Sequence, residues 1–340
     1  MHIFNQLNKI IIATLTLITY WPQTQAMILT TSCLKRHVTP KITNKLVLLY
    51  DRHALLDDPI SMNHVRDMKL LVNTLTKRKD SFPFFVEIAE AHKDPSRQNN
   101  MELSPSNFVI QLALNNNMRY KNINFIPFDS RNNSDFFVRD MILQTNEFAQ
   151  AINNKYPFND DFYTITAENF LNQLNIRHKS VINSIEQLPV SSVIKNQDHS
   201  TSKTLYANCY TTILALLKKY NVDSHKEHIF NLIFQLNNAE INALFLTLTK
   251  ENCFSLDINL LKEILKNSKD HSLCILLAGS YHSNNIEKRL MSHYEGFEKD
   301  LESSMTLPGL TFDNLSSMHP TTNIPDNFMN KNMERFLLTE

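Results

Sequence analysis

The stretch "LCILLAGSYH", residues Leu273 to His282, joins a continuous apolar run to one of only three glycines in this 340-residue chain. A short apolar run that ends at a glycine and precedes an amphipathic segment is typical of a buried strand that leads into a helix. The missing side chain of Gly279 allows the backbone to bend sharply or a ligand to approach. We therefore expect a core strand over Leu273–Ala278, with His282 at the carboxyl end of a sheet, where open α/β folds build their sites.

Three further runs in the first half of the chain have the same apolar character, namely Leu46–Tyr50, Phe82–Ile88 and Ile123–Phe128. Between them, Asp58–Lys77 and Pro105–Asn117 have helical spacing of apolar residues. Continuous apolar strands that alternate with amphipathic helices indicate a parallel sheet covered on both faces. The predicted fold class is α/β, a parallel-rich sheet flanked by helices, in which the four strands are parallel neighbours.

The rest of the chain divides by its sequence pattern. Residues 135–267 show one helical pattern after another and are interpreted as an all-helical insertion, or cap, between the third and the last core strand. The α/β core then comprises residues 40–134 and 268–300. Residues 187–203 are rich in structure-breaking residues and predict an exposed connection, and residues 301–340 lack periodicity and predict a poorly ordered tail.

Residues 1–26 resemble a secretory signal peptide. An apolar stretch, Ile10–Tyr20, follows Lys9, and Thr24–Ala26 offers a small-x-small cleavage site. The apolar stretch is too short for a comfortable membrane span, so we expect an exported protein with no span after cleavage. The formal net charge is zero, with 42% hydrophobic and 20% charged residues. Basic residues are balanced by acids, which argues against nucleic-acid binding.

The four cysteines are too widely spaced for a zinc cluster. In an oxidising compartment they allow up to two disulfides, in any of three pairings. Alternatively, some are small buried hydrophobic residues. The four positions are Cys33, Cys209, Cys253 and Cys274.

Acids and histidines follow or interrupt all four predicted core strands. Two imidazoles and several carboxylates at one sheet edge suit a divalent metal site, or a histidine that activates water while a carboxylate orients it. Glu87 is notable because an apolar run would bury its charge unless the charge has a partner. The candidate catalytic residues are His53, His282, Glu87 and Asp51; those expected to contact substrate or support them are Arg52, Asp129, Arg131, Tyr281 and Gly279; the candidate metal ligands are His53, His282 and Glu87.

This arrangement resembles the superfamily that contains ChaN-like haem-binding lipoproteins, TraB/TIKI-type metallopeptidases and erythromycin esterases. Gly279 to His282, "GSYH", matches the family's second motif, Gly-x-x-His. Where the family has Gly-Glu-x-His, this chain has "YDRH" from Tyr50 to His53, which keeps the histidine and an acid. The resemblance covers residues 45–130 and 270–295. It implies an α/β fold with a helical insertion, in which His53 and His282 face each other and Glu87 is their acidic partner.

These observations support three functional hypotheses. The first is a secreted hydrolase of ester or peptide bonds that acts through His53, Glu87 and His282, with a divalent metal such as manganese as the candidate cofactor. The second is a non-catalytic ligand-binding or host-interaction protein on the same scaffold, with haem as the alternative ligand through histidine or tyrosine ligation. The third is a degenerate, inactive member of the superfamily. The expected partner is a small molecule or a peptide, and the sequence leaves the oligomeric state open.

Overall fold

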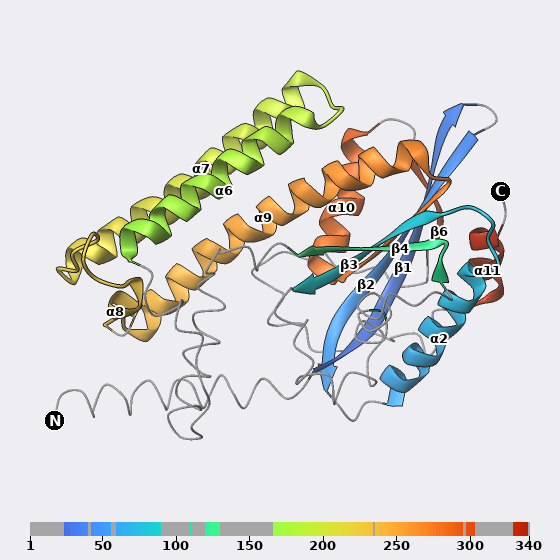
Figure 1. Ribbon diagram of the computed structural model, residues 1–340, viewed down its shortest axis with the longest axis horizontal. Helices are drawn as coiled ribbons and strands as arrows, with labels where there is room; N and C mark the ends of the chain where they lie inside the picture. The colour runs from blue at the N-terminus through green and yellow to red at the C-terminus, as the bar shows by residue number, and fades with distance from the viewer. Residues whose placement is uncertain are drawn as a thin grey trace. The chain divides into compact units, whose positions relative to one another are not determined.

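The computed structural model describes residues 24–39, 42–55, 59–89, 109, 120–129, 166–233, 235–294, 297–302 and 329–338. The described residues within Arg131–Gln187 and Ser191–Ile258 form one compact unit, which is helical. Those within Gln23–Ser130, Leu188–Val190 and Asn259–Glu340 form a second unit, which is α/β. Figure 1 shows the helices and strands of both units along the chain.

The α/β unit is built on a mixed sheet of six strands within the described residues, in the order β4-β3-β5-β2-β1-β6. Pairing is parallel between β2 and β5, β5 and β3, and β3 and β4, so the four predicted core strands are parallel neighbours, as expected. Strand β1 pairs antiparallel with β2 and with β6. The strands are β1 (Thr24–Thr39), β2 (Ile42–Leu55), β3 (Phe82–Ala89), β4 (Ile123–Asp129), β5 (Leu273–Gly279) and β6 (Phe297–Glu302).

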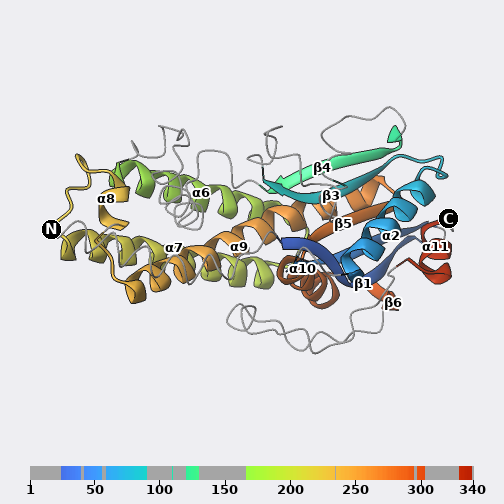
Figure 2. The same cartoon turned by 90° about the horizontal axis from the view of Figure 1, so that it is seen from below.

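Helices flank this sheet, as the apolar strands predicted. Residues 46–50 of β2 and 273–278 of β5 are buried over their whole length, which requires cover on both faces. Helix α2 (Pro59–Leu75) and helix α11 (Lys331–Leu338) share one apolar cluster with alternate residues of β2, β3 and β5. Helix α10 (Ser280–His293) packs on β2 and β5. Figures 1 and 2 show these helices around the strands of the α/β unit.

Between β4 and β5, the described residues form four helices: α6 (Ala167–Gln187), α7 (Ser192–Lys219), α8 (Ile229–Ile233) and α9 (Asn238–Asp270). Because α7 begins at Ser192, the exposed connection predicted over residues 187–203 is wrong for most of its length. The hydroxyls of Thr201 and Thr204 donate to carbonyls one turn earlier, so these polar residues are accommodated within the helix. Among the described residues, none of the helices is long and apolar enough to span a membrane.

Both ends of the described chain differ from the predicted domain scheme. Strand β1 begins at Thr24, inside the segment predicted as a signal peptide, and extends the sheet beyond the core predicted to start at residue 40. Helix α11 lies in the segment predicted as a poorly ordered tail, yet Met333, Phe336 and Leu337 belong to the main apolar cluster. Their i, i+3, i+4 spacing gives α11 one apolar face. For residues 329–338 the prediction of a poorly ordered tail is therefore wrong.

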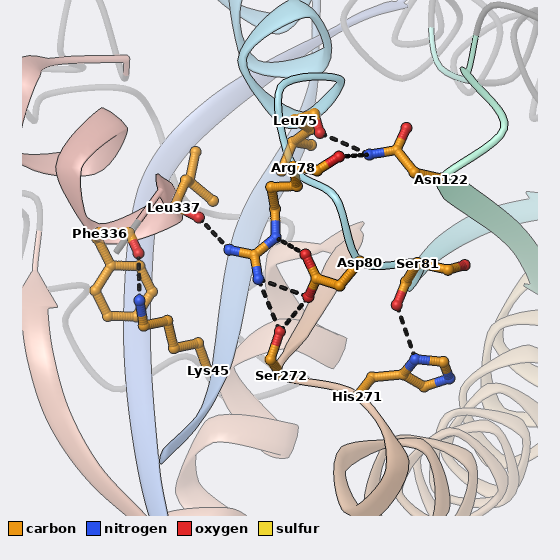
Figure 3. A network of polar contacts seen from close by, with 10 residues as sticks. All are labelled: Lys45, Leu75, Arg78, Asp80, Ser81, Asn122, His271, Ser272, Phe336 and Leu337. Carbon is orange, nitrogen blue, oxygen red and sulfur yellow. Dashed lines mark hydrogen bonds and ion pairs between the residues drawn. The ribbon is translucent and has the colours of Figure 1, made fainter. Parts of the chain in front are cut away.

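Two cations hold the carboxyl end of α11 (Figure 3). Lys45 donates from Nζ to the Phe336 carbonyl oxygen at 2.8 Å and lies 5.1 Å from the centre of the Phe336 ring. Arg78 donates to the Leu337 carbonyl oxygen. Positive charge at this end satisfies carbonyls that have no partner within the helix and complements the helix dipole. Burial lowers the pKa of the Lys45 ammonium to about 8.

Arg78 also connects α11 to the loops that precede β3 and β5. Its Nε and Nη2 donate to the two carboxylate oxygens of Asp80 at 2.8 and 2.6 Å, and Nη2 donates to Ser272 Oγ at 2.7 Å. Burial alone raises the pKa of Asp80, but hydrogen bonds from Arg78 and Ser272 outweigh it and hold the pKa below its ordinary value. Figure 3 shows this network, which stabilises the amino-end edge of the parallel strands.

Replacing Arg78 with methionine should lower the free energy of unfolding by about 2 kcal/mol, because a nearly buried guanidinium loses hydrogen bonds to Asp80, Ser272 and Leu337. Lys77→Met is the matched control. Lys77 also pairs with α11, through Glu334 at 3.5 Å, but both side chains are largely exposed, so the expected change is below about 0.5 kcal/mol. Urea unfolding of the two variants tests this, and equal effects would contradict it.

All four cysteines lie within the described residues, and none is paired in a disulfide. Cys33, Cys209 and Cys274 are buried, which favours the alternative of small buried hydrophobic residues. Burial raises the pKa of each of these three thiols to about 12. A thiol with so high a pKa is a poor nucleophile at neutral pH.

Candidate functional site

The carboxyl ends of the four parallel strands lie at one edge of the sheet, in the order β4, β3, β5, β2. In the register, Asp129 is opposite Ala89, and Gly279 is opposite Asp51. Glu87 lies on β3, the strand next to β5. The sheet thus brings the predicted acidic positions of β2, β3 and β4 to the edge where β5 ends.

A direct contact joins two of the predicted site residues. Glu87 accepts a hydrogen bond at Oε2 from the backbone N–H of Gly279, with 2.6 Å between the heavy atoms. Gly279 is the N-cap of α10, so the carboxylate lies at the positive end of the helix dipole, which stabilises its ionised form. The charge predicted inside the apolar run of β3 therefore has a specific partner.

The position of Gly279 is explained by this contact. Its φ of −50° is accessible to any residue, so a left-handed conformation is not the reason for glycine. A Cβ atom built on Gly279 would lie 3.2 Å from Glu87 Oε2 and 4.0 Å from His282 Cδ2. Glycine permits the close approach of the Glu87 carboxylate, and the His282 ring lies beside the same point.

His282 lies in the first turn of α10 and is 8% exposed. Its ring meets the ring of Tyr281 edge-on, with 5.6 Å between the ring centres. Tyr281 is partly exposed, and its expected contact with substrate stays a prediction. A nearly buried imidazole has the chemistry of a general base or a metal ligand.

The end of β2 differs from the sequence prediction. His53 was expected in a turn after the strand, but β2 continues to Leu55, and His53 is paired with Ala26 of β1. The antiparallel partner β1 prolongs β2 beyond its apolar residues. Asp51 is buried on this strand. The side chains of Arg52, His53 and Asp129, and the whole of Arg131, lie outside the described residues.

The described side chains contain no group of three histidines, cysteines or acids that lie closely enough together to hold a metal ion. Of the three predicted ligands, Glu87 and His282 are described, whereas the side chain of His53 is not. The metal site therefore stays a prediction, while the proximity of Glu87 and His282 to Gly279 is a structural finding.

The sequence did not single out Glu287, a residue of α10 that joins several strands. Its carboxylate accepts hydrogen bonds from Tyr50 of β2 and, at 2.9 Å, from Ser32 of β1. It also pairs with Lys299 of β6 at 2.8 Å. Tyr50 is 2% exposed, and its hydroxyl donates to this carboxylate.

Comparison with known proteins adds nothing to this geometry, since no family model, curated protein or solved structure matches the chain.

Replacing Gly279 with alanine should destabilise the protein by about 1 kcal/mol. The new Cβ would force the Glu87 carboxylate outward by a few tenths of an ångström and lengthen its hydrogen bond to the residue 279 amide. The same replacement in a Glu87→Ala background should be neutral or stabilising, because the obstacle is gone and φ suits alanine. Thermal unfolding of the four proteins of this double-mutant cycle measures the coupling, and additive effects would contradict it.

Proposed function

We propose that the chain is an exported hydrolase of ester or peptide bonds, with its site at the carboxyl ends of β2, β3 and β5. The observation that carries the proposal is the convergence of Glu87 and His282 on Gly279. The resemblance of the motif residues to the superfamily of ChaN-like proteins, TraB/TIKI-type metallopeptidases and erythromycin esterases supports the same assignment. Export, through a signal peptide in residues 1–26, is part of the proposal.

In the proposed reaction, an imidazole of His282 or His53 accepts a proton from water as the water oxygen attacks the carbonyl carbon. The tetrahedral intermediate then breaks the ester or peptide C–O or C–N bond, and the imidazolium returns the proton to the alcohol or amine that leaves. Glu87 orients the protonated imidazole and stabilises its charge, in the role that a buried carboxylate has in other histidine-dependent hydrolases. The Gly279 N–H holds the carboxylate in place for this role. A divalent metal such as manganese would bind His53, His282 and Glu87 and supply a more acidic water.

The interpretation of residues 135–267 as one all-helical insertion is also part of the proposal, and its support is the helical sequence pattern of these residues. The expected substrate is a small molecule or a peptide.

The same Glu87 contact also suits a purely structural role, because a carboxylate that accepts from an N-cap amide stabilises a helix. Glu87→Gln separates the two roles. Glutamine retains a side-chain oxygen that accepts from Gly279 N–H, so stability should change by less than about 1 kcal/mol, whereas a charged orienting group is lost. A stable but inactive Glu87→Gln protein supports the hydrolase.

The experiment measures hydrolysis of p-nitrophenyl acetate and of a peptide library, with and without manganese. Wild-type activity should fall at least about 100-fold in His282→Ala and in Glu87→Gln. His225→Gln is the control, since His225 is largely exposed and pairs with Glu168 in the helical unit. Activity that is equal in all variants, or absent from the wild type, overturns the proposal. In the latter case, a Soret band on titration with haem would favour the ligand-binding alternative.

A further inference from the structure

Helix α10 is anchored to the sheet by two polar side chains one turn apart. Ser283 is fully buried, and its hydroxyl donates to the Ala278 carbonyl oxygen of β5 at 3.1 Å. Glu287 follows at i+4, on the same side of the helix, and binds Tyr50 together with Ser32 and Lys299. Three strands, β1, β2 and β6, thereby hold one carboxylate of α10.

These anchors bear on His282 because of its place in the helix. His282 precedes Ser283 directly and lies at the end of α10 that is capped by Gly279. A helix moves as a rigid element, so the register of Glu287 on the strands sets the position of the first turn. The interaction is also nearly buried, since the Glu287 side chain is 14% exposed and Tyr50 is 2% exposed. Loss of the Glu287 carboxylate would remove the acceptor of the buried Tyr50 hydroxyl, and loss of this hydroxyl would leave Glu287 held by Ser32 and Lys299 but no longer by β2.

We propose that Tyr50 and Glu287 are positioning residues, which fix α10 on the sheet and thereby hold the His282 ring and the Gly279 amide against Glu87. The inference rests on the proposed function, because it assigns Glu87 and His282 to the hydrolytic site. It also gives Tyr50 a role. The aromatic residue that replaces the family's glycine at this position ties β2 to α10 through its hydroxyl.

The low glycine content offers a direct measurement. Protein labelled with ¹⁵N-glycine gives signals from only three glycine amides, and the Gly279→Ala variant assigns the one at position 279. An amide that donates a short hydrogen bond to a carboxylate has a downfield proton shift, so this signal reports on the Glu87 contact. The His282 ring is followed in parallel through the NMR signals of its ring C–H groups at constant pH, assigned with His282→Gln.

Tyr50→Phe is the decisive variant, because it removes one hydroxyl without changing the charge. We expect the Gly279 amide proton to move upfield, its exchange with solvent to accelerate about tenfold, and the ring C–H signals of His282 to move at constant pH. Glu287→Gln should have the same effects. Lys288→Gln is the matched control, since it changes the charge of an exposed residue on the same helix and should leave the Gly279 signal in place.

An unchanged Gly279 signal and unchanged ring signals of His282 in Tyr50→Phe and Glu287→Gln overturn the proposal. If either variant fails to fold, Ser32→Ala takes its place, because it removes a single hydrogen bond to the same carboxylate. These readouts need no substrate. If the signals shift in the variants but the wild type has no hydrolase activity, the positioning role stands and the proposed function is rejected. Unshifted signals in an active enzyme would reject the positioning role alone.

Discussion

Replacing Leu337 with alanine is expected to lower the free energy of unfolding by about 3 kcal/mol. Leu337 is fully buried in the main apolar cluster, and truncation to alanine removes its transfer free energy and leaves a cavity between α11 and the strands. Its neighbour Leu338 is 38% exposed. Leu338→Ala, the same substitution one position later, should change stability by no more than about 0.5 kcal/mol.

Urea unfolding followed by circular dichroism measures both variants. A difference between them shows that α11 is part of the folded core. Equally small changes in the two variants would mean that residues 329–338 do not contribute to the core, and the sequence prediction of a poorly ordered tail would then hold.

Raising the pH above 9 is expected to destabilise the protein steeply. Cys33, Cys209 and Cys274 have an ordinary pKa of 9, and burial raises the pKa to about 12 in the folded protein. The raised pKa of each thiol contributes to the free energy of unfolding. This contribution is fully present below about pH 9 and is lost as the pH rises towards 12, because in this range only the unfolded chain releases the proton. Each thiol then lowers the free energy of unfolding by about 1.4 kcal/mol per pH unit.

Lys45 acts in the opposite direction. Its folded-state pKa of about 8 lies below the ordinary value of 10.5, so its contribution to stability grows over this window and offsets one of the three thiols. Urea midpoints at pH 7, 9 and 10.5 test the balance. Cys209→Ala should make the alkaline loss shallower, and Lys45→Met should make it steeper. A stability that is independent of pH up to 10.5 would show that the three thiols are accessible to solvent.

The parallel part of the fold could be predicted from the sequence because its strands are buried on both faces. Continuous apolar runs such as "LVLLY" and "LCILLA" leave little alternative to a covered strand. The antiparallel strands β1 and β6 carry many polar residues, as in "FEKDLE", and their pairing depends on partners far along the chain. Helix α11 is short, so its single apolar face gave too weak a periodic signal to predict.

For the candidate site, the sequence identified single residues but not their contact partners. Glu87 was identified because a charge within an apolar run requires a partner, and His282 because it follows a strand that ends in glycine. The partner of Glu87, a backbone amide, has no sequence signature. Glu287 has an ordinary place in an amphipathic helix, and its contacts with Ser32 and Tyr50 join residues that are distant in the sequence. The turn predicted at His53 was wrong because β1 lengthens β2.

The central place of β5 has a consequence for how the chain folds. Strands β2 and β3 do not pair with each other, and β5, the strand that joins them, is synthesised long after both of them, because it begins only at Leu273. Until then, the hairpin of β1 and β2 and the pair of β3 and β4 each present an unpaired apolar edge. Contacts between residues so far apart in sequence form slowly. The nascent protein is therefore prone to aggregation before Leu273–Gly279 is inserted, and the synthesis of β5 sets the earliest time at which the sheet can close.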